Sequence, residues 1–302
     1  MAKLIQWFPG HMKKAMRDME EKRALCDGVI CVLDSRAPIA TYNPKLPEIF
    51  AGKPVLYVLN KSDLSDGKSE KFAAMIEAQG KPCVAISAVN GASRRVLEKR
   101  LQILTKEKRE RAESKGVTRR FRYTVVGIPN TGKSTVVNLL GGAKRAKTGD
   151  IAGVTRDVRW IKCADFDLLD TPGTMPPSCK TQYLARHLAY IGSLNDDILD
   201  IADVALELLK DLKANYPAAL QERYGIDCGG NNAETDKTAD EEERTREAVE
   251  MLETACRRRG FILRGGEFDY ERGARAVIDD FRKGRLGKIC LENPSDFADV
   301  KF

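Results

Sequence analysis

The sequence has 302 residues, enough for two domains of about 150 residues each. Hydrophobic residues make up 42% and charged residues 31%, with a formal net charge of +7, which permits a polyanionic partner without requiring one. No apolar run approaches the roughly 20 residues of a membrane span, and no basic start with an apolar stretch indicates export. The eight cysteines form no CxxC pair, so we expect a reduced, cytoplasmic protein without a zinc site.

The first segment combines a turn signal with a lone histidine. Pro9-Gly10 stands immediately before His11, and a helical pattern with Ala15 and Met19 on one face follows. A single histidine is usually a surface or packing residue. Its neighbours in the folded chain must decide its role.

Three apolar runs predict parallel strands that are buried on both faces. They span residues 29–33, 54–59 and 83–86, with a short helix within 42–50 and a longer one through 72–78. Polar residues follow each run. Open α/β sheets bind ligands beyond the carboxyl ends of their strands, so these polar residues are candidates for a binding site.

Asn60-Lys61-x-Asp63 follows the second strand and suggests recognition of a base. The Asp63 carboxylate can accept hydrogen bonds from N1–H and the 2-amino group of guanine, whereas adenine offers neither donor. Asn60 would brace the loop and approach the other edge of the base, and the stem of Lys61 would pack on the ring. Ser87 and Ala88 would offer a backbone N–H to the guanine O6. An ordinary polar loop is the alternative for so short a motif.

Residues 98–122 form the most basic run of the chain. Interleaved glutamates make a solvated helix with i,i+3 and i,i+4 ion pairs one explanation. The acids stop before Gly116, which leaves Arg119, Arg120 and Arg122 uncompensated. We expect this end to contact a phosphate backbone.

The clearest motif is Gly127-x-x-x-x-Gly132-Lys133-Ser134, between a β-branched strand and an apolar helix. The glycines let backbone N–H groups surround the α- and β-phosphates, Lys133 would reach the β- and γ-phosphates, and the Ser134 hydroxyl would bind Mg²⁺. The phosphates would lie at the N-terminus of the helix. The residues expected to contact the nucleotide are Asn130, Thr131, Gly132, Lys133, Ser134 and Thr135.

Three residues after this P-loop complete the phosphate site. Thr155 would give Mg²⁺ a second hydroxyl and close over the γ-phosphate. Asp170 ends a strand and would hold Mg²⁺ through water, and the N–H of Gly173 would sense the γ-phosphate. Together with the base-reading motif, these residues predict a GTP site whose Mg²⁺ ligands are Ser134, Thr155 and Asp170.

The order of these elements is circularly permuted. Small GTPases begin with the P-loop and end with the guanine reader, whereas here residues 60–63 and 87–88 precede residues 127–134. We expect residues 1–177 to form a circularly permuted P-loop GTPase domain of the α/β class, with a mostly parallel sheet and helices on both faces. The basic linker near residues 99–122 would join the last helix of the usual order to the first strand.

Residues 178–302 are expected to form a small all-α domain that binds RNA. Amphipathic stretches recur, and one of them ends at Arg257-Arg-Arg-Gly260. A glycine cap and terminal cations suit a helix end, but three arginines exceed what a cap requires. We expect His187 to be structural.

Trp7-Phe-Pro-Gly-His11-Met and Asp34-Ser-Arg-Ala-Pro38, with Gly265–Tyr270 and Asp280–Gly284, make the chain closely resemble the ribosome biogenesis GTPase A family (YlqF-type). The resemblance covers nearly the whole length. It implies cytoplasmic GTP hydrolysis coupled to late assembly of the large ribosomal subunit. Contacts with rRNA would use the basic segments 99–122 and 257–288, and the protein would be a monomer off the ribosome.

The resemblance also assigns the catalytic roles. Many GTPases place a glutamine just after Asp-x-x-Gly to orient the attacking water, but here Thr174 and Met175 follow. The family usually carries a larger apolar residue where Thr174 stands, so the packing there would differ. By likeness to the family, His11 would position the water, beside Lys133 and Thr155.

Asn130 matches the asparagine with which potassium-stimulated GTPases help to hold K⁺ beside the phosphates. A loop-bracing amide is the alternative. GTP or GDP, Mg²⁺ and K⁺ are therefore the expected cofactors. Two other functions stay open: a nucleotide-gated switch acting on another RNA or protein, and a scaffold that needs GTP only to fold. The complete set of metal-side residues argues against the scaffold.

Overall fold

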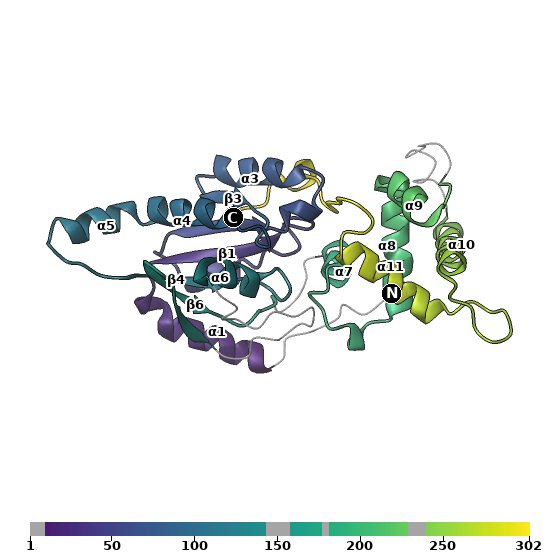
Figure 1. Cartoon of the computed structure of the whole chain (residues 1–302), viewed down its shortest axis with the longest axis horizontal. Helices are drawn as coiled ribbons and strands as arrows, with labels where there is room; N and C mark the ends of the chain where they lie inside the picture. Colours follow the sequence, from purple (N-terminus) through teal and green to yellow (C-terminus); the bar gives the residue numbers. More distant parts are fainter. Residues whose placement is uncertain (1–9, 143–157, 177–180, 229–239) are drawn as a thin grey trace.

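The computed structural model describes residues 10–142, 158–176, 181–228 and 240–302. These residues form a six-stranded sheet flanked by helices, with a bundle of helices at one end (Figure 1). The strands are β1 (Gly28–Asp34), β2 (Val55–Asn60), β3 (Cys83–Ala85), β4 (Phe121–Val126), β5 (Arg159–Lys162) and β6 (Phe166–Asp170).

The strand order is β3-β2-β1-β4-β6-β5. Every neighbouring pair is parallel except β5 and β6, which are antiparallel, so the mostly parallel sheet is confirmed. Asp34 is in register with Asn60, and Val125 with Asp170. The carboxyl ends of β1, β2, β4 and β6 therefore meet at one edge of the sheet, as the sequence predicts.

The alternation of side chains along β1 divides the core into two layers. Cys31 and Leu33 face α1 (Gly10–Lys22), α2 (Lys45–Ile49) and α3 (Lys68–Ala78). Ile30 and Val32 face α4 (Ser93–Leu104) and α6 (Lys133–Gly141). Every residue of β1 is buried, and burial of an aliphatic side chain contributes about 1.5–3 kcal/mol. Helices on both faces explain why this strand is apolar throughout.

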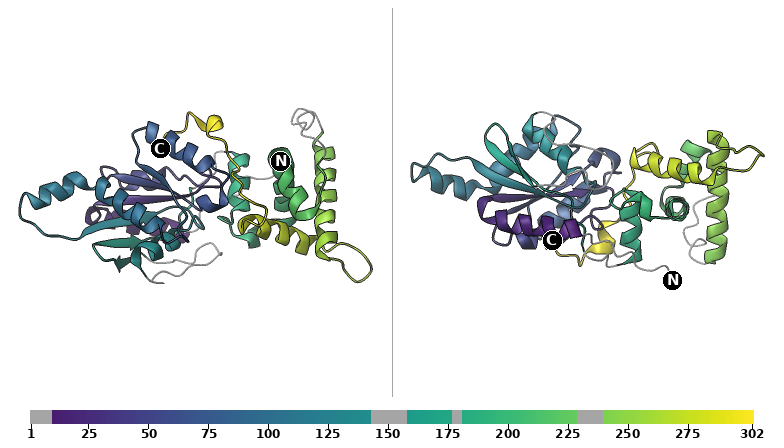
Figure 2. Two further views of the ribbon diagram at one scale, coloured as in Figure 1. Left: turned by 45° about the horizontal axis from the view of Figure 1, so that its top comes forward. Right: turned by 90° about the horizontal axis from the view of Figure 1, so that it is seen from below.

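The basic linker continues α4 into α5 (Lys106–Glu113), which has no buried residues. Both views of Figure 2 place α5 at the end of the molecule opposite the helical bundle. An ion pair one helical turn apart joins Lys106 to Glu110 at 3.7 Å. Lys106 and the glutamates of α5 are exposed, whereas Lys108 donates to the carbonyl of Asp27 at 2.7 Å and Arg109 lies over the Phe121 ring.

The bundle is built around α8 (Ile201–Asn215), which contacts four neighbouring helices. These are α7 (Gln182–Tyr190), α9 (Pro217–Tyr224), α10 (Glu241–Arg259) and α11 (Tyr270–Arg282). Asp200 caps α8 by accepting the N–H groups of Ala202 and Asp203.

In the part of the chain that the structure describes, no helix is both long and apolar enough to cross a membrane.

After α11 the chain returns to the sheet domain. The N–H of Leu291 donates to the carbonyl of Arg36 at 2.7 Å, and the ring of Phe302 packs against Tyr42 and Tyr57 with centroids 4.6 and 5.6 Å apart. The last residues of the segment expected to be helical thus join the core of the sheet domain. The division at residues 177 and 178 stays a prediction.

His187 and Glu292 lie buried where the two parts meet. The Glu292 carboxylate accepts the backbone N–H groups of Ile39 and Ala40 at 2.6 and 3.0 Å, and it lies 3.1 Å from His187 Nδ1. The pair joins α7 to the loop after β1, which is a structural role for His187.

Candidate active site

The loop between β4 and α6 can be formed only with glycine at its two ends. Gly127 has φ +154°, and a Cβ there would lie 2.5 Å from the carbonyl oxygen of Val32. Gly132 has φ +88°, and a Cβ there would lie 2.2 Å from the Asn60 amide nitrogen. Both glycines thus have positive φ angles and let neighbouring groups approach the backbone closely, where a side chain would clash.

Lys133 is the first residue of α6 and is 7% exposed. Its Nζ donates to the carbonyl of Ile128 in the same loop at 2.7 Å. Burial lowers the pKa of Lys133 to about 8, and the Asp170 carboxylate opposes this shift. An anion bound in the loop would raise the pKa of Lys133 again and keep its amine fully protonated.

The other predicted loop residues surround this lysine. Ser134 and Thr135 are half-buried in the first turn of α6. Thr131 is buried, and its hydroxyl donates to the carbonyl of Ile128 at 3.1 Å. The two hydroxyls of the first turn therefore lie at the N-terminus of α6, where an anion binds favourably.

Asp170 ends β6 and is fully buried, and neither of its carboxylate oxygens accepts a hydrogen bond from the described residues. Arg159 lies 3.7 Å away, which is an ion pair too long for a hydrogen bond. Burial raises the pKa of Asp170, and Lys133 and Arg159 oppose the shift. A buried carboxylate with unfilled acceptors suits a bound cation. Thr155, the other predicted ligand beyond the P-loop, lies outside the described residues.

The chain that leaves β6 packs directly on the P-loop. A Cβ on Gly173 would lie 2.7 Å from the backbone nitrogen of Pro129. The N–H of Thr174 donates to the carbonyl of Gly127 at 3.3 Å, and its carbonyl accepts from the Asn43 amide at 3.1 Å. Gly173 thus lies beside the loop, and the small, buried Thr174 fits that contact.

Asn60 connects the base-reading elements to the P-loop. Its amide nitrogen donates to the carbonyl of Thr131, and its amide oxygen accepts the N–H of Ala88, both at 3.0 Å. The bracing role expected for Asn60 is therefore present. The Ala88 N–H, expected to bind the guanine O6, is engaged with Asn60 instead, and the buried hydroxyl of the adjacent Ser87 has no hydrogen-bond partner among the described residues.

The Asp63 carboxylate is exposed at the same edge and accepts no hydrogen bond from the described residues. Lys61 adopts a left-handed conformation with φ 62°. Its Nζ contacts the carbonyl of Asn130 at 2.6 Å and the Asp34 carboxylate at 2.9 Å. Lys61 is thereby held against the P-loop.

Asp34 is a functional candidate that sequence reasoning missed. It is fully buried at the end of β1, and its carboxylate binds both Lys61 and Arg36, at 2.9 and 2.8 Å. Burial would raise the pKa of Asp34, but the two cations hold it well below its usual range. Arg36 also donates to the carbonyl of Arg282 at 3.1 Å and lies over the Phe281 ring. A charged residue directly after a buried strand was the available signal.

Two contacts join the P-loop to the loop after α7. The Asn130 amide donates to the carbonyl of Gly192, and the Ser193 hydroxyl donates to the carbonyl of Pro129 at 2.7 Å. Asn130 has φ 61°. These contacts favour the loop-bracing interpretation of Asn130 in this conformation, and they link the phosphate loop to the helical bundle.

His11 is the second residue of α1. The next residue, Met12, belongs to a buried cluster with Ile128 of the P-loop and Met175, just after Gly173. The beginning of α1 therefore packs into the same hydrophobic core as both phosphate-side elements.

The expectation that Arg119, Arg120 and Arg122 are uncompensated was wrong, and Arg122 lies 4.0 Å from the Asp167 carboxylate. Arg119 pairs with Asp27 at 2.8 Å, and Arg120 pairs with Asp167 at 3.0 Å. Arg120 also donates to backbone carbonyls of the β5–β6 connection. Partners distant in sequence neutralise much of this charge.

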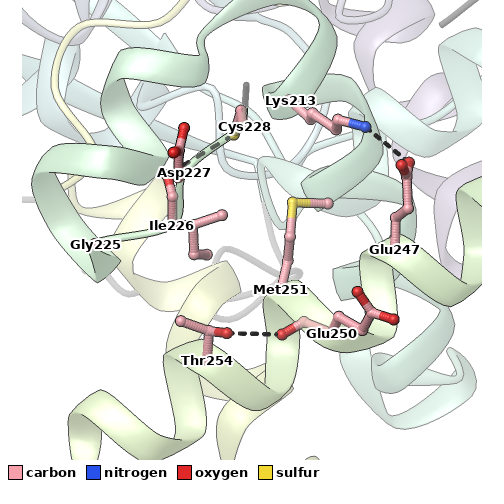
Figure 3. Close-up of a pocket in the computed structure, with 9 residues that line it drawn as sticks. All are labelled: Lys213, Gly225, Ile226, Asp227, Cys228, Glu247, Glu250, Met251 and Thr254. Carbon is pink, nitrogen blue, oxygen red and sulfur yellow. Dashed lines mark hydrogen bonds and ion pairs between the residues drawn. The ribbon is translucent and has the colours of Figure 1, made fainter. Parts of the chain in front are cut away.

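A separate hollow of about 410 Å³ lies in the helical bundle (Figure 3). Its lining includes the carboxylates of Asp227, Glu247 and Glu250, while its lysine, Lys213, pairs with Glu247 at 2.7 Å. The acidic lining disfavours a phosphorylated ligand there. The P-loop edge is therefore the candidate nucleotide site.

The sheet and this edge define a P-loop GTPase with circularly permuted elements. The family model described as 50S ribosome-binding GTPase matches residues 122–228. The match begins within β4, so Asn60–Asp63 precede it, as the permuted order requires.

Whole-length relatives identify the family. Ribosome biogenesis GTPase A of Bacillus cereus is 37% identical over 299 residues, which cover 98% of this chain and 96% of that protein. The Thermotoga maritima protein of the same name is 28% identical over 98% of this chain and 97% of its own. The chain belongs to the ribosome biogenesis GTPase A family.

Solved structures support the same fold. The GDP-bound structure of TM YlqF has a TM-score of 0.63 at 26% identity and covers 93% of this chain and 100% of that chain. GNP-bound YlqF from T. maritima has a TM-score of 0.62 at 26% identity, over 93% of this chain and 98% of its own. Both structures of this similar protein were thus solved with a nucleotide.

Proposed function

We propose that this GTPase binds a precursor of the large ribosomal subunit and couples GTP hydrolysis to a late step in its assembly. The names of its whole-length relatives and the description of the matching family model support this partner. The observation that carries the proposal is the convergence of Asp63, Lys133 and Asp170 at one sheet edge. The proposal includes a cytoplasmic location and a monomer off the particle.

Lys133 would neutralise charge on the transferring phosphoryl group. Ser134, Asp170 and Thr155 would hold Mg²⁺, which when bound supplies charge across the β- and γ-phosphate oxygens. The orphaned oxygens of Asp170 fit this role. Asp63 would select guanine through its exposed carboxylate, while Asn60 and Lys61 keep the base-reading loop against the P-loop.

His11 would orient the attacking water. This role is supported by the neighbouring Met12, which belongs to the same buried cluster as Ile128 and Met175. A partner that fixes this segment would complete the site only in the complex, giving slow intrinsic turnover and strong stimulation.

His11→Ala should therefore lower the particle-stimulated GTP turnover by about a hundredfold or more, because positioned proton transfer contributes typically 10²–10⁴-fold. Basal turnover and GTP affinity should change little. The measurement is phosphate release with and without purified large ribosomal particles.

Lys14→Ala, an exposed change on the same helix, is the matched control and should be stimulated normally. Equal stimulation of His11→Ala and wild type would remove His11 from catalysis. Absence of stimulation in the wild type would contradict the ribosomal partner and favour a switch that acts on another RNA or protein.

K⁺ would be held beside the phosphates with help from Asn130. The amide nitrogen of Asn130 donates to the carbonyl of Gly192, and its amide oxygen would be the atom that binds the cation. The same residue would then link the phosphates to the helical part.

Replacing K⁺ by Na⁺ should slow wild-type turnover severalfold, and Asn130→Ala should be slow in both salts, because the added positive charge stabilises the transition state only where it is held. Ser193→Ala removes the neighbouring contact to Pro129 without removing a cation ligand and should keep the K⁺ response. A fully K⁺-stimulated Asn130→Ala enzyme would contradict the assignment.

Contacts with rRNA would use the basic segments 99–122 and 257–288. Carboxylate partners engage Arg119 and Arg120. In the second segment Arg259 and Arg285 also pair with a carboxylate. However, Arg257 and Arg258, exposed at the end of α10, have no carboxylate partner among the described residues, so the second segment has the stronger support.

A further inference from the structure

A basic pocket lies where the ends of α9, α10 and α11 meet. Its volume is about 580 Å³, and its lining includes the arginines Arg223, Arg258, Arg259 and Arg285. Glu222 is the acidic residue among the lining residues. Four guanidinium groups around one open pocket make a strong local concentration of positive charge.

A single buried carboxylate holds three of these arginines. Asp280 accepts two hydrogen bonds from Arg223, at 2.8 and 3.0 Å, and further ones from Arg259 at 3.2 Å and Arg285 at 2.9 Å. The Tyr224 hydroxyl adds another at 2.9 Å. Burial would raise the pKa of Asp280, but its hydrogen bonds with Arg223, Arg285 and Tyr224 hold it below its ordinary value. Asp280 is therefore a fixed anion.

One carboxylate cannot neutralise this set. Counting Glu222 and Asp280 against the four arginines leaves a formal excess of two positive charges. Asp279 does not change this balance, because it pairs with Lys283 at 2.8 Å as well as with Arg285 at 3.1 Å. The excess matches an anionic ligand.

Arg258 lines the pocket but is not bound by Asp280. It approaches the backbone at Gly225, where an added Cβ would lie 3.1 Å from its guanidinium. No acidic partner for Arg258 occurs among the described residues. Guanidinium groups that are already ordered lose little freedom on binding, and their paired N–H groups match phosphate oxygens.

The basic surface continues beyond the pocket. Arg257, the neighbour of Arg258, stacks on Phe268 of the loop between α10 and α11, and Arg272 stacks on Phe261 of the same loop. This loop extends from the bundle at the end away from the sheet (Figure 1). A polymer with regularly spaced phosphates can use such an extended surface, whereas a free phosphate needs only the pocket.

We propose that the pocket formed by Arg223, Arg258, Arg259 and Arg285 binds one backbone phosphate of an RNA partner, with Asp280 as the positioning residue that orients the arginines. The proposal rests on the proposed function for its partner and adds the site of attachment. It makes Arg258 a direct phosphate ligand.

The test compares Arg258→Ala with wild type and with Arg246→Ala, a 70%-exposed arginine on the same helix whose nearest carboxylate, Glu243, is 3.8 Å away. Full-length proteins would bind a fluorescein-labelled 20-nucleotide oligouridylate over a series of salt concentrations. Arg258→Ala should bind roughly tenfold more weakly, since it loses a charge-assisted hydrogen bond. Its log–log salt slope should shrink by about 0.7, the value for one phosphate on a single strand. Arg246→Ala should match wild type.

Removal of Arg258 breaks no contact with Asp280, so the variant should keep the wild-type thermal midpoint and basal GTP turnover. An unchanged affinity and salt slope in folded Arg258→Ala would overturn the pocket assignment. Micromolar binding of inorganic phosphate, lost in Arg258→Ala while RNA affinity is unchanged, would assign a small-anion site and also overturn it.

The same proteins would be assayed for stimulation by large ribosomal particles. Normal stimulation of Arg258→Ala, together with an unchanged salt slope for RNA binding, would reject the pocket assignment but not the proposed function. No stimulation of the wild type would reject the proposed function, whichever result the oligouridylate gives.

Discussion

Lys133→Met is expected to lower GTP turnover by at least about a hundredfold, the cost of removing one preorganised donor from a transition state. Methionine keeps the buried stem of the side chain but removes the charge that would meet the transferring phosphate. Ser134→Ala should have a comparable effect through loss of a metal ligand. Single-turnover hydrolysis at saturating GTP measures both.

The stability of Lys133→Met provides the control. The folded pKa of Lys133, about 8, is below its ordinary 10.5, so the protonated lysine disfavours folding below pH 8 and the penalty fades as pH rises toward 10.5. Without nucleotide, the variant should be at least as stable as wild type at pH 7. Above pH 8 the free energy of unfolding of wild type should rise relative to that of the variant. Turnover within twofold of wild type would show that this P-loop is not the active site.

Asp63→Asn should move nucleotide preference from guanine toward xanthine. Wild type should prefer GTP to ATP by at least about a thousandfold. Adenine offers no hydrogen-bond donor to the Asp63 carboxylate, and a site that leaves such a polar group unpaired rejects the wrong ligand strongly. Asparagine can donate to the 2-oxo group of xanthine. Competition of GTP, XTP and ATP against a fluorescent GDP analogue measures this shift.

Asp165→Asn makes the same chemical change at an exposed position between β5 and β6, and it should leave base preference unchanged. Equal affinity of wild type for ATP and GTP would defeat the assignment of Asp63. Unchanged preference in folded Asp63→Asn would place base recognition elsewhere.

Much of the fold and the site could be predicted because local signals coincide. Each candidate binding element follows an apolar run, and parallel strands bring their carboxyl ends together whatever the order of the chain. This is why Asn60 and Gly132, far apart in sequence, come into contact. The chemistry of each residue type then limited what it could bind.

Long-range charge pairing could not be predicted in this way. The partners of Arg119 and Arg120 are Asp27 and Asp167, and no local period connects them. The binding of Lys61 by Asp34 and the use of the Ala88 N–H by Asn60 likewise depend on tertiary geometry. A sequence pattern reports which face of an element is apolar, but it does not report which distant charge satisfies a polar group.

The return of the chain to the sheet domain restricts how the helical bundle can move. The chain connects the bundle to the sheet domain after β6, and the backbone contacts of Ile289 and Leu291 join the two parts a second time. Side-chain contacts of Asn130 and Arg36 join them at further positions. A body held at several positions cannot swing freely on one hinge, so nucleotide-dependent movement near Gly173 would reach the bundle only as a small, restricted displacement.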